Sequence, residues 1–250
     1  MSGISVIIPT FNMRQALERC LGRIVEQTLQ PSEIVIVDDG STDGTAVWVG
    51  EHKSSVPIET IFISQNHTGA SAARNNGFSH SMGELIIFLD ADVVLKKHAL
   101  ERLQRTLYQQ STINNQHLQV GYAYSSFRWG WKKFSSYPFD ANRLQKMPYI
   151  HTTSLIKREA LPEKPFDEQL KRLQDWDLYL TLLERGYGGV YIPEVLFTVE
   201  VKGSMSAWLP SIMYQIPFSR FGVKISTLEK YRAAEHAIKD KHRISNKTNL

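Results

Sequence analysis

The first 111 residues alternate short apolar runs with segments of helical periodicity. Four apolar runs predict buried strands, at residues 5–9, 34–37, 58–63 and 85–89. Between these runs, apolar side chains recur at every third or fourth position, which is typical of helices packed on a core. This alternation favours an α/β fold, in which a mainly parallel sheet is flanked by helices.

Residue types that begin and end helices mark the element boundaries. Asn12 is a candidate N-cap, with Gln15 three residues later, and Pro31 ends this first helix. The run at 85–89 is the most apolar strand, so we expect it near the centre of the sheet. Further helices are predicted at residues 45–53, 70–81 and 97–110.

The alternation of apolar runs with segments of helical periodicity becomes weaker after residue 111. Residues 120–131 are rich in aromatic side chains, an amphipathic helix is predicted at 173–183 and ends at Gly186, and short strands are predicted at 190–192 and 195–201. We divide the chain into three parts: a first half at 1–111, a second half of the same domain at 112–204, and a C-terminal extension at 205–250.

The charge distribution and the cysteine content limit which partners and which compartment are expected for the protein. Lys and Arg are dispersed along the chain, so the formal net charge of +4 does not indicate a nucleic-acid partner. The single cysteine, Cys20, excludes internal disulfides and fits a reducing compartment. No signal peptide and no membrane span are expected. A cytoplasmic location follows, with peripheral contact at the inner face of a membrane as an option.

Three predicted strands end in residues that can bind a ligand: Pro9-Thr10-Phe11, Asp38-Asp39 and Asp90-Ala91-Asp92. Ligands of open α/β sheets lie at the carboxyl ends of strands. Buried carboxylates without partners are unfavourable, so a ligand at this edge is expected to compensate them.

Asp90 and Asp92 are two residues apart, so on an extended backbone both side chains point the same way and can share Mg²⁺ or Mn²⁺. Such an ion would neutralise a diphosphate. The alternative is an aspartate-rich turn. Asp38-Asp39 would accept hydrogen bonds from a base or ribose, whereas Ser41 and Asp43 fit a turn and a helix cap.

Five strings in this order resemble family 2 glycosyltransferases of the GT-A fold: SVIIPTFN, IVIVDDGSTDGT, NHTGASAARNNG, LIIFLDAD and LQDWDLYLTLLERGY. The resemblance implies a GT-A type, Rossmann-like sheet with a smaller acceptor-binding lobe. It makes 1–111 the nucleotide-sugar-binding half and 112–204 the acceptor-binding and catalytic half.

The resemblance also implies roles for the residues of the first half. Pro9, Thr10 and Phe11 would line the nucleotide base, with Phe11 where the family commonly has tyrosine. Asp39, together with Asp38, would hold the uracil or ribose of a UDP-sugar. Arg74 would lie near the base and phosphates.

The Asp90-Ala91-Asp92 triplet is similar to the family's Asp-x-Asp motif. Asp92 would bind the divalent cation directly, and Asp90 would position the ribose or a metal-bound water. Asp175 lies where the family has its catalytic base, which removes the proton from the acceptor hydroxyl. Many relatives have glutamate at the position of Gln174. Asp177 fits a structural role near the start of the helix better than catalysis.

The implied reaction is an inverting, metal-dependent transfer of a sugar from a nucleotide-diphosphate sugar to a hydroxyl of a glycan or lipid-linked glycan, in polysaccharide or glycoconjugate biosynthesis. The alternative is a catalytically weak relative that binds nucleotide-sugar or glycan in polysaccharide assembly, because an acid is absent at Gln174. A nucleotidyltransferase or a dinucleotide-dependent oxidoreductase is disfavoured, since no glycine-rich loop follows the first strand.

Several aromatic residues and histidines have alternative interpretations. Trp129, Trp131 and Trp176 are candidates for stacking on a sugar or for packing, and packing is the favoured interpretation of Trp176. His67 and His151 are interpreted as loop or packing residues, with contact to a phosphate or an acceptor as the alternative. The aromatic and basic extension at 205–250 is interpreted either as a peripheral membrane contact or as a segment packed on the second half or in an oligomer interface.

Overall fold

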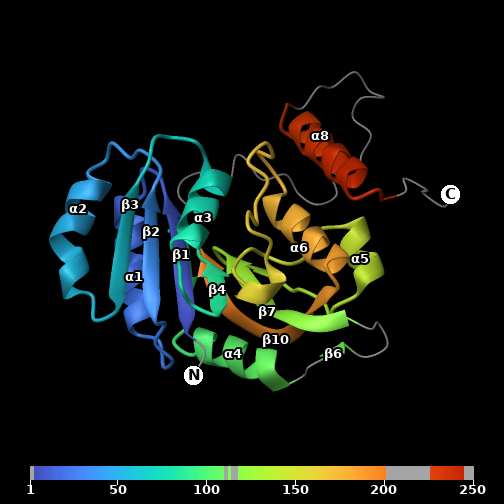
Figure 1. Ribbon diagram of the computed structural model, residues 1–250, viewed down its shortest axis with the longest axis horizontal. Coiled ribbons are helices and arrows are strands. Elements are labelled where there is room, and N and C mark those ends of the chain that lie inside the picture. The colour runs from blue at the N-terminus through green and yellow to red at the C-terminus, as the bar shows by residue number, and fades with distance from the viewer. Residues whose placement is uncertain (1–2, 110–111, 114–117, 201–225, 245–250) are drawn as a thin grey trace.

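The computed structural model describes residues 3–109, 112–113, 118–200 and 226–244 of the 250-residue chain. The molecule is built on one ten-stranded sheet, with helices on both faces (Figure 1). The strand order is β3-β2-β1-β4-β9-β7-β10-β5, and β6 and β8 both pair with β7. This confirms the predicted α/β fold with a mainly parallel sheet.

The first half of the sheet consists of four parallel strands. β1 (Ile4–Thr10) lies between β2 (Glu33–Asp38) and β4 (Leu85–Phe88), and β3 (Glu59–Ser64) flanks β2. Every residue of β1, β2 and β4 is buried, as expected of apolar strands covered on both faces. These strands end at the same edge of the sheet, which therefore gathers the residues that follow each of them.

The second half extends the same sheet and does not form a separate one. β9 (Leu155–Lys157) pairs antiparallel with β4 and β7 (Leu118–Trp129), and β10 (Tyr187–Val199) pairs parallel with β7. β5 (Val93–Leu95) pairs antiparallel with β10. The short strands that complete the sheet are β6 (Thr112–Ile113) and β8 (Lys132–Phe134).

β10 corrects the prediction of two separate short strands. The strand is continuous, but its pairing with β7 shifts register between Ile192 and Val195 and again before Phe197. Pro193 lies within this irregular stretch and has no N–H to donate to a neighbouring strand. The proline therefore displaces the pairing locally without ending the strand.

Helices cover the two faces with separate apolar cores. In β1, Val6 and Ile8 face a core shared with α1 (Arg14–Val25) and α4 (Ala99–Gln109), whereas Ile7 faces the other core. α2 (Thr45–His52), followed by a 3-10 turn at Lys53–Ser55, contributes Val49 to the first core. The opposite face is covered by α3 (Ala70–Ser79), α5 (Ala141–Lys146) and α6 (Gln174–Glu184).

The start of α1 differs from the prediction. Asn12 is not the N-cap: it has a left-handed φ of +51°, and the helix begins at Arg14. Asp43, distant in sequence, accepts the Arg14 N–H at 3.0 Å, and Ser41 Oγ accepts the Asn12 N–H at 2.8 Å. The tertiary contact between two loops thus replaces the local cap, and it confirms structural roles for Ser41 and Asp43.

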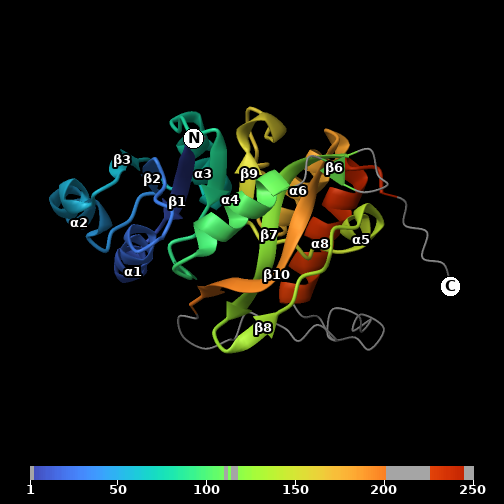
Figure 2. The ribbon, with the colours of Figure 1, turned by 90° about the horizontal axis from the view of Figure 1, so that it is seen from below.

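The C-terminal part contains a helix that the sequence pattern did not predict. α8 (Ser226–Lys241) lies beside α6 in two perpendicular views (Figures 1 and 2). Its Ile238 is fully buried in the core that contains α6. The aromatic stretch of the extension at 205–225 lies outside the described residues. None of the described helices is long and apolar enough to cross a membrane.

Candidate active site

A pocket of about 360 Å³ opens at the carboxyl edge of the parallel strands. Eight residues singled out from the sequence line it: Pro9, Thr10, Phe11, Asp39, Arg74, Asp90, Ala91 and Asp92. Met13, His67, Ala70 and Ala73 complete the lining. The ends of β1, β2 and β4 and the first turns of α3 thus meet around one cavity.

Asp39 holds together the loop between β3 and α3. Its Oδ1 accepts the Thr68 N–H at 2.9 Å and the Gln65 amide at 2.8 Å, and its Oδ2 accepts the Gly69 N–H at 2.8 Å. Burial alone would raise the pKa of Asp39, but these hydrogen bonds outweigh burial and lower the pKa below its usual value. The carboxylate is therefore ionised and fixed in position.

Asp38 has a different environment from Asp39. Its side chain is buried and accepts the Ser41 N–H at 3.1 Å, and Asp38 is not part of the pocket lining. A direct contact with a ligand is therefore proposed for Asp39 alone, whereas Asp38 supports the turn that follows β2.

The two aspartates after β4 lie on a turn. The Val93 N–H donates to the Asp90 carbonyl at 2.9 Å, so the backbone folds back at Ala91 and does not continue as an extended strand. This corrects the extended geometry assumed from the sequence. Asp90 and Asp92 nevertheless line the same pocket. The Asp92 carbonyl also accepts the Glu200 N–H at 2.8 Å, which ties the turn to the end of β10.

Arg74 connects the two halves of the site. Its Nη2 donates to Asp90 Oδ1 at 2.6 Å, its Nη1 donates to Gln174 Oε1 at 3.2 Å, and its guanidinium lies 5.2 Å from the centre of the Phe166 ring. The Arg74 charge outweighs the effect of burial on Asp90 and holds the pKa of Asp90 below its usual value. Arg74 Nε is buried without a hydrogen-bond partner among the described residues, as is Thr10 Oγ1.

Asp175 lies in the first turn of α6, next to Gln174. Its Oδ1 accepts the Trp176 N–H at 2.9 Å. Burial raises the pKa of Asp175, and this effect exceeds the opposing effects of that hydrogen bond and of the Arg74 charge. A carboxylate with a raised pKa accepts a proton more readily than an ordinary aspartate does. Asp175 is not part of the lining of the 360 Å³ pocket.

His67 was interpreted as a packing or loop residue, and the structure places it in the pocket. Its ring stacks on Phe11 with a centroid distance of 4.1 Å, and its Nδ1 lies 2.9 Å from Asp39 Oδ2. Both rings are partly exposed at the pocket. The sequence signal was available, because His67 lies inside one of the strings that carry the family resemblance, but the partner ring comes from a different strand end.

His151 lies near Asp90 and packs against the rings of Phe127 and Phe197, at centroid distances of 4.8 and 5.0 Å. Burial lowers its pKa to about 4, so the ring is neutral at neutral pH. Its Nδ1 accepts the Thr153 N–H at 3.1 Å, which leaves the ring proton on Nε2. The packing role predicted for His151 is confirmed, and the ring lies close to Asp90.

Exposure differs among three of the tryptophans, Trp129, Trp131 and Trp176. Trp176 is buried and donates its indole N–H to the Leu144 carbonyl at 2.6 Å, which confirms its packing role. Trp131, in the turn between β7 and β8, is 92% exposed, and Trp129 is 38% exposed. These two side chains are accessible to a ligand.

Asp90 and Asp92 are the candidate ligands for a divalent cation. No group of three or more His, Cys, Asp or Glu side chains in the described part of the chain is placed to hold a metal ion. Mg²⁺ in phosphate-transfer sites commonly uses one or two carboxylates and completes its coordination with substrate phosphates and water. Two carboxylates on one turn, at a pocket with unpartnered hydrogen-bonding groups, fit that type of site.

The sequence is similar to known glycosyltransferases. The model of the family described as glycosyl transferase family 2 matches residues 5–163. A Campylobacter jejuni relative, GalNAc(5)-diNAcBac-PP-undecaprenol beta-1,3-glucosyltransferase, is 35% identical over 106 residues, which are 42% of this chain and 34% of that protein. The matched regions span between 17% and 39% of the first curated relatives' lengths.

Two solved structures share the fold. The mannosyltransferase PcManGT from Pyrobaculum calidifontis has a TM-score of 0.66 at 20% identity, covering 98% of this chain and 71% of that chain. Staphylococcus aureus TarS has a TM-score of 0.64 at 17% identity, covering 98% of this chain and 74% of that chain. At this level of identity the likeness is one of fold.

Proposed function

This chain belongs to glycosyltransferase family 2 and has the GT-A fold, and from that premise we propose that it transfers a sugar from a nucleotide-diphosphate sugar to a hydroxyl of a glycan or lipid-linked glycan. The reaction would invert the anomeric centre and serve polysaccharide or glycoconjugate biosynthesis. The observation that carries the proposal is the pocket at the ends of β1, β2 and β4, where Asp39, Arg74 and Asp92 meet.

The donor would bind with its base beside Phe11 and His67. The Phe11 ring supplies a stacking face, and Pro9 and Thr10 lie next to it in the lining. Asp39, ionised and held by two backbone N–H groups, would accept hydrogen bonds from the base or ribose. We favour UDP because TarS was solved with UDP-GlcNAc, although PcManGT was solved with GDP-Man.

Arg74 and the turn at Asp90–Asp92 would bind the diphosphate. Arg74 lines the pocket, its Nε has no hydrogen-bond partner among the described residues, and its guanidinium is suited to anionic oxygens. Asp92 and Asp90 would hold Mn²⁺ or Mg²⁺. PcManGT, which shares the fold, was solved with Mn²⁺. When bound, the cation stabilises negative charge on the departing diphosphate. Arg74 would also keep Asp90 ionised and oriented through their 2.6 Å contact.

Asp175 would act as the base. The acceptor oxygen attacks the anomeric carbon, its proton passes to a carboxylate oxygen of Asp175, and the bond between that carbon and the diphosphate oxygen breaks. A single displacement inverts the anomeric centre. The Campylobacter relative is named for a β-1,3 linkage, which is the expected product of inversion if its donor is an α-linked nucleotide sugar.

The acceptor would approach from the second half. Trp129 and Trp131 offer exposed aromatic faces on which a sugar ring can stack. Peripheral membrane contact through 205–250 would bring a lipid-linked acceptor to the enzyme. The Campylobacter relative's name includes undecaprenol, which supports a lipid-linked acceptor.

Two carboxamide variants test the assignment of the donor and acceptor sides. We expect both Asp92→Asn and Asp175→Asn to reduce sugar transfer by at least 100-fold, because each removes a group that acts on a charge or proton in the transition state. Only Asp92→Asn should weaken Mn²⁺-dependent binding of the nucleotide-sugar. Transfer is measured by release of nucleoside diphosphate, and binding by thermal shift with and without Mn²⁺.

Glu51→Gln is a suitable control, because Glu51 is exposed on α2 and this change should alter neither quantity. Full activity of the Asp175→Asn variant would show that Asp175 is not the base. Donor binding by the wild-type protein without any transfer would instead favour the non-catalytic binding partner, for which the amide at Gln174 is the supporting feature.

A further inference from the structure

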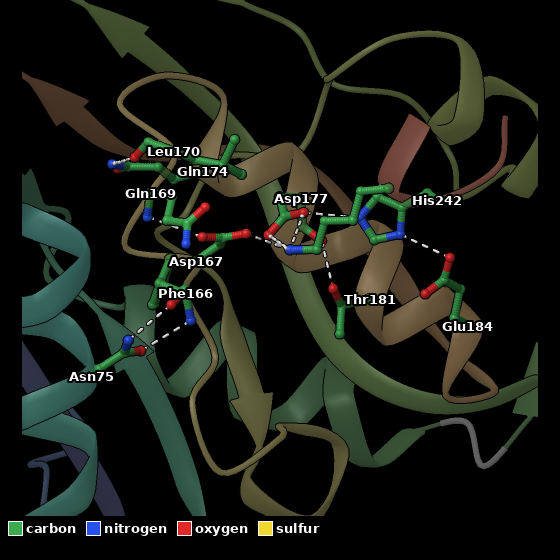
Figure 3. Close-up of polar contacts among 11 residues, drawn as sticks. Asn75, Phe166, Asp167, Gln169, Leu170, Gln174, Asp177, Thr181, Glu184 and His242 are labelled. Carbon is green, nitrogen blue, oxygen red and sulfur yellow. Dashed lines mark hydrogen bonds and ion pairs between the residues drawn. The ribbon is translucent and has the colours of Figure 1, made fainter. Parts of the chain in front are cut away.

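Helix α8, together with His242 directly after it, contacts α6 through a partly buried group of charged side chains (Figure 3). Lys241 Nζ lies 2.9 Å from Asp177 Oδ2 and 3.0 Å from Asp167 Oδ2. His242 Nε2 lies 2.9 Å from Asp177 Oδ1, and its Nδ1 lies 2.8 Å from Glu184 Oε1. The Asp177 and His242 side chains are only 2% and 3% exposed. Asp177 therefore depends on α8 for the partners that compensate its buried charge.

These contacts fall at both ends of the segment that contains Asp175. Asp167 precedes α6 and Asp177 lies in its first turn, so Lys241 joins two points that are ten residues apart in the chain. Asp175 lies between them. Lys241 thus connects α8 to a particular segment, residues 167–177.

The same segment is held from the other side by α3. Asn75 Nδ2 donates to the Phe166 carbonyl at 2.8 Å, and Asn75 Oδ1 accepts the Phe166 N–H at 3.0 Å (Figure 3). Gln174 donates to the Leu170 carbonyl at 2.8 Å and accepts from Arg74. The segment is therefore fixed between the donor half and α8.

Leu173, two residues before Asp175, has a left-handed φ of +58°. This conformation is unfavourable for a residue with a Cβ atom, and it persists only where the surrounding contacts impose it. Asn75 contacts Phe166 before this position, Arg74 and Lys241 contact Gln174 and Asp177 after it, and Leu173 itself packs against the core that contains α6. Loss of the Lys241 contact would therefore remove one of the contacts that hold the backbone near Asp175.

We infer that α8 is a positioning element of the catalytic segment: Lys241, assisted by His242, holds residues 167–177 so that Asp175 faces the acceptor. The inference rests on the proposed function, since it assigns α8 a part in that reaction. Lys241 and His242 are positioning residues and touch neither substrate.

The test compares Lys241→Met with Lys239→Met. Methionine keeps an unbranched side chain but removes the charge, and Lys239 forms its ion pair within α8, with Glu235 at 2.6 Å. We expect Lys241→Met to lower kcat at least tenfold and to leave the KM for the nucleotide-sugar within twofold. Lys239→Met should change neither. Lys241→Arg should restore part of kcat, and His242→Gln should give a smaller decrease.

A second measurement does not require a known acceptor. Amide hydrogen exchange of residues 167–177 should become faster in Lys241→Met and stay unchanged in Lys239→Met, with protection of β1 and β2 retained in both. Unchanged exchange in Lys241→Met, or a wild-type kcat, overturns the inference.

A purely structural role has a different signature. If Lys241→Met loses nucleotide-sugar binding together with kcat, and protection of β1 falls as well, α8 stabilises the whole fold and the positioning role is wrong. If the wild-type protein transfers no sugar, the proposed function fails, and the exchange experiment still decides whether Lys241 holds the segment.

Discussion

At the scale of single residues, the environment of each carboxylate differs between the proposed donor side and the proposed acceptor side. Hydrogen bonds and the Arg74 charge lower the pKa values of Asp39 and Asp90, which suits groups that stay ionised while they bind a ligand. Burial raises the pKa of Asp175, which suits a group that must take up a proton. Three residues of one type, Asp39, Asp90 and Asp175, therefore have opposite chemical tendencies because their surroundings differ.

The raised pKa of Asp175 predicts the acidic limb of the pH–rate profile. The base acts only when ionised, so activity should fall as the pH decreases through a pKa above the usual aspartate value of 3.8. The measurement is kcat/KM against pH with a saturating concentration of Mn²⁺. An acidic limb at or below pH 3.8 would contradict the assignment of Asp175 as the base.

At the scale of secondary-structure elements, the close approach of α3 to the sheet positions Arg74. Gly77 lies where α3 crosses β1 and β2, and a Cβ atom there would meet Ile7 Cγ2 at 2.5 Å and Val37 Cγ2 at 3.1 Å. Arg74 is one turn earlier on the same helix. The absence of a side chain at Gly77 therefore determines how near Arg74 comes to Asp90.

Gly77→Ala should destabilise the protein by about 1–3 kcal/mol, because overpacking at the sheet outweighs the better helix propensity of alanine. Gly22→Ala on α1 is the matched control, since a Cβ atom at Gly22 would meet nothing within 4 Å. That change should stabilise the protein by about 0.5–1 kcal/mol. Urea denaturation measures the free energy of unfolding of both variants. An increase in this free energy for Gly77→Ala would show that α3 is free to move away from the sheet.

At the scale of the whole molecule, one sheet joins the two halves of the chain, and α8 packs beside α6. Burial opposes a charge on His242, but its hydrogen bonds with Asp177 and Glu184 outweigh burial and raise its pKa. Lys241, the other charged group at Asp177, is also part of this contact. We therefore expect protonation of His242 to strengthen the docking of α8.

Because the pKa of His242 is raised in the folded protein, its contribution to the free energy of unfolding should decrease as the pH rises. Its contribution should be complete below the unfolded-state pKa of about 6.5 and should be lost as the pH rises through the higher folded-state pKa. His242→Gln should remove about 2 kcal/mol at pH 6 and less at pH 9. Thermal melts of the wild-type protein and the His242→Gln variant between pH 6 and pH 9 measure this difference in stability. Equal losses at both pH values would mean that His242 is not charged in the folded protein.

Local sequence patterns predicted the order of the secondary-structure elements and the family to which the chain belongs. Short continuous apolar runs bounded by turn residues favour strands covered on both faces, so β1, β2 and β4 could be predicted from the sequence. The polar residues at their ends indicated the edge where the pocket lies. Those signals depend on neighbours along the chain. The family resemblance added roles for Asp92 and Asp175, which remain predictions.

Contacts between distant segments were decided only by the tertiary structure. Asp43 caps α1 in place of Asn12, His67 stacks on Phe11, and α8 supplies the partners of Asp177. Each of these pairs is separated by 29 or more residues, and neither member has a local pattern that identifies the other. A local pattern reports which face of an element is apolar, whereas hydrogen bonds and ion pairs depend on which elements the fold brings within about 3 Å.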